Sequence, residues 1–263
     1  MKPADVEALL ARAQKPSDDA MRLHPAYRGK LAVTPKCSIN SCDDFAVWYT
    51  PGVAAPCRDI AAHPERVFSH TNKGNFVAVV SDGTRVLGLG DIGPHAALPV
   101  MEGKALLFKY LGGVDAFPIC LATKDPEEII QACKWLEPSF GAINLEDIAS
   151  PKCFYILERL RQELTIPIWH DDQQGTAAVT LAGLMNALKL VGKTVAGARV
   201  VLVGAGAANL PVARLLFAAG FPPANLVMVD SKGILHRGRE DLKTGNNPYK
   251  WRICELTNRE QRS

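Results

Sequence analysis

Apolar and β-branched residues gather in short runs of strand length along the chain from about residue 76 onward. Runs of this length predict strands, because buried strands need only a few consecutive apolar positions. The predicted strands are Phe76–Val80, Val86–Leu89, Ala116–Leu121, Ala142–Leu145, Ile166–Trp169, Arg199–Val203 and Leu226–Val229. The segment Ser81–Thr84 between the first two is typical of a hairpin turn.

Segments with helical periodicity alternate with these strands. We expect helices over Pro99–Tyr110, from a cap at Asp125 to Leu136, from Ser150-Pro151 through Leu164, from Thr176 to about Val191, and after residue 209 to about Ala219. Such alternation predicts an α/β fold with a parallel sheet covered by helices.

The first 75 residues have a different pattern. A polar start predicts a helix around Asp5–Ala13, followed by an irregular arm through His24–Tyr27. Residues 31–75 are interrupted by several prolines, so short helices and loops should dominate there. We expect the N-terminal segment of residues 1–30 to contact a partner protein.

A glycine-rich turn follows the strand Arg199–Val203. Gly204 permits a tight turn, and Gly206 leaves no side chain where a pyrophosphate would meet the backbone. Asp230 ends the next strand, where an acid can accept a hydrogen bond from a ribose 2′-hydroxyl. Asn209 stands where the G-x-G-x-x-G pattern has its third glycine. The unit predicts a dinucleotide site, and an ordinary α/β turn is the alternative.

Two acidic pairs follow two of the predicted strands. Glu146-Asp147 comes after Ala142–Leu145, and Asp171-Asp172 comes after Ile166–Trp169. The carboxyl ends of parallel strands meet at one edge of a sheet, so these acids should lie close together. Carboxylates at such short range repel one another unless a cation lies between them, and they suit Mg²⁺ or Mn²⁺. The alternative is that each pair belongs to an ordinary solvated turn.

Three further residues are candidates for chemistry. Lys104 lies in an otherwise apolar helical stretch, where burial can lower a lysine pKa and make it a base, although a half-buried lysine can also extend to solvent. Tyr49 precedes a rigid Pro-Gly turn, where it either points into a cleft or simply packs. Arg85 either binds a carboxylate or decorates the predicted hairpin.

Composition excludes several classes of protein. The sequence has 263 residues with a formal net charge of +3, and this slight, scattered charge argues against nucleic acid or membrane as a partner. No apolar run approaches the ~18 residues of a membrane span, and the start lacks a signal-peptide segment, so we expect a cytoplasmic protein. The 7 cysteines form no C-x-x-C pair and are expected to be reduced, packed thiols.

An ordered series of segments resembles the malic enzymes, which oxidise and decarboxylate malate. The matching segments are Tyr49–Ala54, Ser81–Gly83, Gly88–Gly93, Met101–Ala105, Ile143–Ile148, His170–Ala177, Asn186–Lys189, Gly204–Ala208 and Asp230–Gly233. The resemblance runs from about Tyr27 to about Lys250. It implies oxidation of (S)-malate to pyruvate and CO₂, with NAD or NADP and Mg²⁺ or Mn²⁺ as cofactors, in a homodimer or higher oligomer.

The resemblance also implies roles for single residues. The metal ligands would be Glu146, Asp147 and Asp172. Lys104 would be the general base, supported by Asp171, and Tyr49 the general acid. Arg85 would hold a substrate carboxylate. The cofactor would lie against Gly204, Gly206, Ala207, Ala208 and Asp230.

The resemblance implies two domains of unequal completeness. We expect a malic-type N-terminal domain over residues 1–164 and a Rossmann-like dinucleotide domain over 165–263. Known members of the family continue well beyond the position of Ser263, so we expect an incomplete second domain in a C-terminally shortened malic enzyme. The resemblance leaves NAD and NADP open, because Asp230 favours a free 2′-hydroxyl whereas Lys232 suits a 2′-phosphate.

The sequence is also compatible with two other functions. One is a catalytically impaired fragment that binds or dimerises without turnover. The other is a metal-dependent phosphoryl hydrolase that uses the four acids, against which the absence of a P-loop counts.

Overall fold

The computed structural model describes residues 3–245 and 247–260. Its larger sheet contains β1 (Phe76–Ser81), β2 (Asp115–Cys120), β3 (Ala142–Leu145) and β4 (Ile168–His170) in the order β2-β1-β3-β4. All three pairings in this sheet are parallel, as the alternation of strands and helices predicts. The α/β fold expected from the sequence is therefore confirmed.

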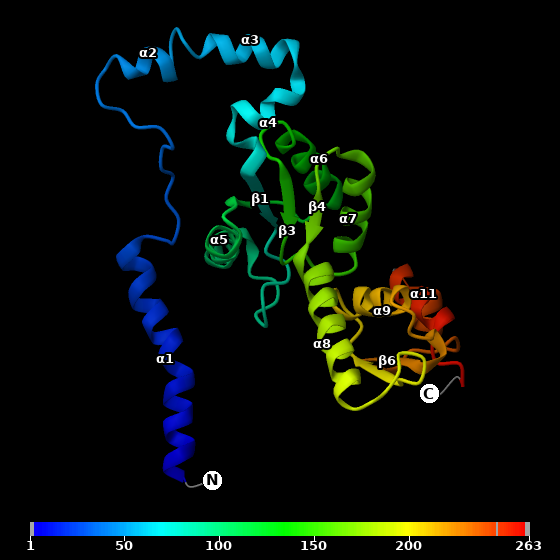
Figure 1. Ribbon diagram of the computed structural model, residues 1–263. Coiled ribbons are helices and arrows are strands. Elements are labelled where there is room, and N and C mark those ends of the chain that lie inside the picture. The colour runs from blue at the N-terminus through cyan, green and yellow to red at the C-terminus, as the bar shows by residue number, and fades with distance from the viewer. Residues whose placement is uncertain (1–2, 246, 261–263) are drawn as a thin grey trace.

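Helices cover both faces of this sheet (Figure 1). On one face, α5 (Gly93–Gly112) packs Met101 and Ala105 against Val79 of β1. On the other face, α6 (Pro126–Leu136) and α7 (Lys152–Glu163) pack against Ala78 and Val80. Successive residues of β1 thus point to opposite faces, because side chains alternate along a strand.

A smaller sheet follows along the sequence. Helix α8 (Thr176–Leu190) leads from the first sheet to β5 (Val200–Val203), which pairs in parallel with β6 (Leu226–Asp230), and β7 (Gly233–Ile234) adds an antiparallel edge. The helices of this part are α9 (Asn209–Ala218), α10 (Glu240–Lys243) and α11 (Pro248–Leu256).

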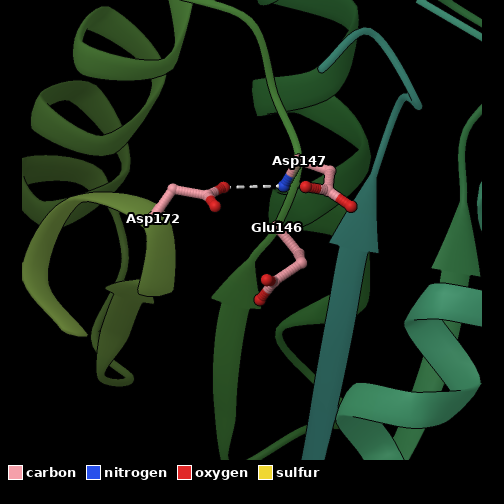
Figure 2. Close-up of side chains that lie close together, drawn as sticks. All are labelled: Glu146, Asp147 and Asp172. Atoms are coloured by element: carbon pink, nitrogen blue, oxygen red, sulfur yellow. Dashed lines mark hydrogen bonds between the residues drawn. The ribbon is translucent and has the colours of Figure 1, made fainter. Parts of the chain in front are cut away.

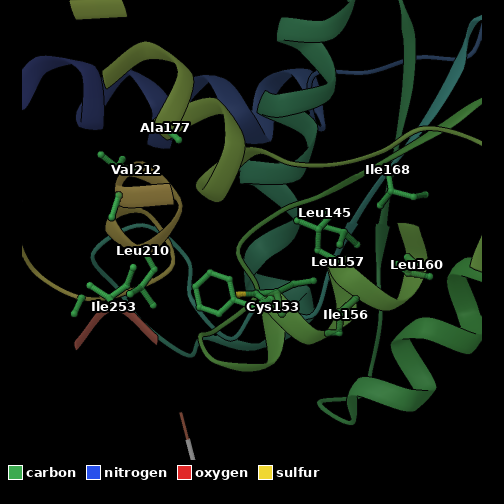
Figure 3. Packing of buried hydrophobic residues seen from close by; sticks show 14 of the residues in the cluster. Leu145, Cys153, Ile156, Leu157, Leu160, Ile168, Ala177, Leu210, Val212 and Ile253 are labelled. Carbon is green, nitrogen blue, oxygen red and sulfur yellow. The ribbon is translucent and has the colours of Figure 1, made fainter. Parts of the chain in front are cut away.

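One buried cluster joins the two sheets (Figure 3). Phe154 of α7 is fully buried, and its ring centroid lies 4.7 Å from that of Tyr249 in α11. Leu210 and Ile253 belong to the same cluster as Leu145 of β3. The first helix after the glycine turn is therefore anchored directly to the core of the larger sheet.

The N-terminal region contains α1 (Pro3–Tyr27), α2 (Asp44–Trp48), α3 (Ala54–Ala62), α4 (Val67–His70) and the 3₁₀ turns η1 (Pro64–Arg66) and η2 (Asn72–Asn75). Helices α1, α2 and α3 of this region extend away from both sheets, whereas α4 lies at the end of the larger sheet (Figure 1). We call residues 3–75 the arm. Among the arm residues whose burial the structure describes, only Lys73 is buried.

Three sequence predictions are wrong in detail. The predicted strand Val86–Leu89 is a loop with one isolated bridge between Val86 and Gly90, and Leu87 has φ 48°, which a strand does not allow. Helix α1 does not stop near Ala13 but continues to Tyr27, and the pair Lys15–Asp19, one helical turn apart, supports this continuation.

The third error concerns the start of α5. It begins at Gly93 rather than Pro99, which lies inside the helix. A proline inside a helix removes one hydrogen bond and crowds the carbonyl four residues before it, but tertiary packing can outweigh this cost. Within the described residues, no helix is long and apolar enough to cross a membrane.

Candidate active site

The loops that follow β1, β3 and β4 meet at the carboxyl edge of the larger sheet. They border an open cavity of about 780 Å³. The post-β1 loop contributes Arg85, α5 contributes Lys104, and the following strands contribute acids, as expected for a parallel sheet. The glycine turn after β5 also lines this cavity.

Three acids from two loops converge in this cavity (Figure 2). Glu146, Asp147 and Asp172 each offer a carboxylate oxygen, and these oxygens lie within 4.8 Å of one another. The backbone N–H of Asp147 donates to Oδ2 of Asp172 at 2.9 Å. Asp147 has φ 54°, a left-handed conformation that is uncommon outside glycine and that turns the backbone sharply after β3.

The three acids fit a divalent cation. Oδ2 of Asp147 is buried and accepts no hydrogen bond within the described part of the protein, and a buried polar atom of this kind needs a partner. Carboxylate oxygens at such separations are the ligands that Mg²⁺ and Mn²⁺ prefer. The sequence prediction that the two acidic pairs lie close together therefore agrees with their placement.

Burial and mutual repulsion shift the pKa values of this cluster upward. Burial raises the pKa of Glu146 to about 7 and, with the charge of Asp172, raises the pKa of Asp147 to about 6. The pKa of Asp172 is also raised, chiefly by burial. Each raised pKa means that the ionised carboxylate is disfavoured when no cation compensates its charge.

Lys104 connects the fourth acid to this cluster. Its Nζ lies 2.6 Å from Oδ2 of Asp171 and 3.2 Å from Oε1 of Glu146. Burial pushes the lysine pKa down, but the hydrogen bond from Lys104 to Asp171 and the charge of Glu146 outweigh it, so the pKa is raised. The burial that the sequence indicates for Lys104 does act to lower its pKa, but the neighbouring acids outweigh this desolvation.

Asp171 responds in the opposite way. Burial raises its pKa, but the hydrogen bond and charge of Lys104 reverse the balance, and the pKa ends below its ordinary value. Asp171 begins a π-helical turn, Asp171–Gly175, which separates its side chain from that of Asp172. One acid of the pair thus contacts the lysine, and the other joins the acidic cluster.

The glycine turn approaches this cluster from the second sheet. Gly204 has φ 103°, where only glycine is unstrained, and Gly206, Ala207, Ala208 and Asn209 line the cavity beside Asp172. The amide of Asn209 donates to the carbonyls of Val203 and Gly204 at 2.9 and 3.0 Å. The residue that departs from the glycine pattern therefore holds the turn, and α9 begins at this point, where the positive end of a helix favours an anion.

Three predicted site residues are not among those that line the cavity. One of them, Asp171, contacts Lys104, which does line it. Tyr49 belongs to the arm, is 69% exposed and is not among the residues lining the cavity. Asp230 lines a second, smaller cavity of about 350 Å³ together with Lys232 and Lys250. Its carboxylate already contacts Arg239 at 3.2 Å and Lys250 at 3.3 Å.

Sequence reasoning missed several residues that shape the site. Nδ2 of Asn144 donates to Oε2 of Glu146 at 2.8 Å and orients this acid. A polar residue within the apolar strand Ala142–Leu145 is a visible signal for it. By contrast, nothing in the sequence pattern marks Arg239 or Lys250 as neighbours of Asp230.

Two family models and several curated relatives match this chain. A family model described as "Malic enzyme, N-terminal domain" matches residues 28–161, and one described as "Malic enzyme, NAD binding domain" matches residues 173–263. The chain is 55% identical over 242 residues to an NAD-dependent malic enzyme of Geobacillus stearothermophilus, covering 92% of this chain and 49% of the relative. It is 48% identical over 212 residues to an NADP-dependent malic enzyme of Escherichia coli, covering 81% of this chain and 28% of the relative.

A solved structure leads to the same family. The crystal structure of Entamoeba histolytica malic enzyme superposes with a TM-score of 0.92 at 48% identity, covering 96% of this chain and 54% of that protein. The chain thus spans about half the length of several relatives that it matches. The two family models, the sequence identities and the superposition establish that this chain belongs to the malic enzyme family.

Proposed function

We propose that this protein performs the metal-dependent oxidative decarboxylation of (S)-malate to pyruvate and CO₂ with reduction of NAD or NADP. The observation that carries the proposal is that one cavity is lined by the acidic cluster, Lys104, Arg85 and the glycine turn. Metal ligands, a base, a carboxylate-binding cation and a pyrophosphate-binding turn are the groups that this reaction needs.

The bound groups would supply part of this chemistry. A Mg²⁺ or Mn²⁺ ion held by Glu146, Asp147 and Asp172 would act as a Lewis acid on the C2 oxygen of malate. NAD or NADP, held at Gly204, Gly206, Ala207 and Ala208, would accept the hydride from C2.

Lys104 is the proposed general base. It accepts the proton of the C2 hydroxyl, after passing its own extra proton to solvent or to a neighbouring acid. Asp171, at 2.6 Å from Nζ, fixes the position of the amine. Arg85 lines the same cavity and binds a carboxylate of the substrate.

Tyr49 is the proposed general acid, which protonates C3 of the enol form of pyruvate. Its exposed position in the arm requires that a second copy of the protein, or a movement of the arm, bring it to a cavity. We therefore propose that the protein works as a homodimer or higher oligomer, whose contacts cover the exposed apolar side chains of the arm.

The adenosine end of the cofactor is proposed to lie near Asp230. The carboxylate of Asp230 is already engaged by Arg239 and Lys250, so a ribose hydroxyl would have to displace one of them. Asp230 by itself therefore does not favour NAD over NADP, and the proposal includes both cofactors. The proposal further places the protein in the cytoplasm, since its 7 cysteines are all free thiols.

A second candidate function is a malate- and metal-binding module without turnover. It is favoured by the position of Tyr49 outside the cavity. Formation of reduced nicotinamide in the presence of malate and Mn²⁺ separates the two. Turnover that disappears in Lys104→Met but not in Lys109→Met, whose lysine pairs with Asp115 of β2 instead, would support the enzyme.

Binding without turnover would indicate the second candidate function. Calorimetric binding of malate and Mn²⁺ without any reduction of NAD or NADP would leave the binding module as the function. Absence of both binding and turnover would contradict both candidates.

A further inference from the structure

A buried ion pair connects the loops that border the cavity. Lys152 is the first residue of α7, and its Nζ lies 2.5 Å from Oδ2 of Asp82, the first residue after β1. The side chain of Asp82 is 0% exposed. The same ammonium donates to the carbonyl of Lys124, in the loop after β2, at 2.9 Å. One lysine after β3 thus contacts the loops that follow β1 and β2.

The other oxygen of Asp82 organises its own loop. Oδ1 accepts hydrogen bonds from the backbone N–H of Thr84 at 3.0 Å and from its hydroxyl at 2.7 Å. The hydroxyl oxygen of Thr84 in turn accepts from the N–H of Ala149 in the loop after β3, at 2.9 Å. Asp82 therefore takes part in two links between the loop after β1 and the segment after β3. One is its ion pair with Lys152, and the other is the hydrogen bond from Ala149 to Thr84, whose hydroxyl it holds.

These two loops carry residues of the proposed site. Arg85 follows Thr84 directly, and its N–H donates to the carbonyl of Asp147 at 3.0 Å. Gly83 allows this close arrangement, because a Cβ at this position would lie 2.3 Å from the carbonyl oxygen of Gly93. A displacement of Asp82 would therefore change the position of Arg85 relative to Glu146 and Asp147.

We propose that Asp82 and Lys152 are positioning residues that set how Arg85 and the acidic cluster together hold a dicarboxylate. The inference rests on the proposed function, since it assumes that Arg85 binds a substrate carboxylate. Neither residue lines the cavity, so both act through the loops that they connect.

The chemistry of the pair favours positioning over general stabilisation. A buried ion pair gives little net stability compared with apolar residues of similar volume, because both charges lose their hydration. The hydrogen bonds that the two side chains make to Lys124 and Thr84 are directional, however, and fix the angle and distance between the groups that they join. The ammonium reaches a carboxylate and a carbonyl on different loops, which an apolar side chain is unable to do.

The test compares Lys152→Met, Lys152→Arg and the double variant Asp82→Asn/Lys152→Met with the wild-type protein. A matched control is Lys134→Met, which removes the 2.8 Å ion pair between Lys134 of α6 and Glu163 of α7. Calorimetry measures the Kd of Mn²⁺ alone and of malate in the presence of Mn²⁺, and thermal unfolding measures Tm.

We expect Lys152→Met to lower Tm and to weaken malate binding by about tenfold or more, because small displacements of binding groups have large effects. The Kd of Mn²⁺ alone should change far less, since Glu146 and Asp172 are held by other contacts. Lys152→Arg should recover part of the malate affinity, and Lys134→Met should leave malate affinity unchanged.

The double variant decides between positioning and stability. It removes both charges, so no unpaired charge stays buried and Tm should rise toward the wild-type value, while malate binding stays weak. Recovery of malate affinity together with Tm would overturn the inference, and so would wild-type malate affinity in Lys152→Met. A wild-type protein that binds neither Mn²⁺ nor malate would instead refute the proposed function.

Discussion

The arm and the carboxyl edge of the larger sheet differ sharply in how their residues pack. At the sheet edge, Glu146 and Asp147 are only 5% and 4% exposed. Their loop is held by a hydrogen bond from Ala149 to Thr84, which is distant in sequence. In the arm, helices form as well, but Trp48 is 57% exposed and Tyr49 is 69% exposed. Helical secondary structure is therefore not sufficient to produce a packed core.

The two regions obtain their stability in different ways. Short helices in water are marginal by themselves and depend on tertiary packing of an apolar face. The sheet edge has this packing within one molecule, whereas the arm exposes apolar residues on α1, α2 and α4, among them Leu10, Phe45, Trp48 and Phe68. Apolar residues exposed in such numbers are typical of a surface that packs against another protein.

The largest expected effect is a core substitution that tests the packed region. Phe154 of α7 is fully buried against Tyr249 of α11, so Phe154→Ala should lower the free energy of unfolding by about 3–5 kcal/mol. Trp48→Ala in the arm removes a side chain of similar size that is 57% exposed, and should have a far smaller effect. Urea unfolding of dilute protein measures both, and similar losses in the two variants would contradict the division into two regions.

A second effect concerns the cation at the sheet edge. Asp172→Ala should abolish the stabilisation of the protein by Mn²⁺, which for a single site reaches about 2.7 kcal/mol at a hundredfold excess over Kd. The control Asp18→Ala removes an exposed acid of α1 and should leave the Mn²⁺-dependent rise in Tm unchanged. An unaltered rise in Tm for Asp172→Ala would remove this residue from the metal site.

The sequence predicts the sheet edge well because the relevant signals are local. Apolar runs predict β1, β2, β3 and β4, and a parallel sheet then brings the residues after each strand together. The proximity of Glu146 and Asp172 follows from this rule alone. The hairpin predicted around Ser81–Thr84 is wrong: the chain bends after β1, and the carbonyl of Gly83 accepts hydrogen bonds from the N–H groups of Ile92 and Gly93 rather than from a neighbouring strand.

Long-range contacts between charged side chains are beyond this kind of prediction. The place of Asp230 at the end of β6 predicts a ribose as its partner, but Arg239 and Lys250 reach it from segments that carry no recognisable motif. The raised pKa of Lys104 has the same origin, since two acids from separate loops outweigh its burial. The direction of such shifts depends on the sum of contacts, which spacing in the sequence does not give.

A third, smaller effect depends on pH. The pKa of Glu146 is raised from 4.5 to about 7, so between these values the folded metal-free protein holds a proton that the unfolded state has lost. The free energy of unfolding therefore decreases as pH rises through this interval. Glu146→Gln removes this penalty and should stabilise the metal-free protein on the order of 1–2 kcal/mol at about pH 8, with little effect at about pH 5.

The control for this experiment lies in the arm. Glu65→Gln removes an exposed acid of η1, so thermal unfolding should show the same pH dependence as the wild-type protein. Saturating Mn²⁺ should reverse the order of Glu146→Gln and wild type, because only the wild-type protein retains all three carboxylates. A stabilising effect of Glu146→Gln that is equal at both pH values would contradict the assignment to ionisation.

The smallest effect on stability should come from the arm itself, and it is the most informative about association. Trp48→Ser should change the free energy of unfolding of the dilute protein by no more than about 0.5 kcal/mol, because exposed side chains contribute little within one molecule. Trp135 of α6 is 75% exposed and provides a matched control, Trp135→Ser, on the packed region. If a second copy covers the arm, sedimentation should show weaker association for Trp48→Ser only. Equal association of wild type and both variants would place the interface elsewhere, and a large loss of stability in the dilute Trp48→Ser variant would show that the arm packs within its own molecule.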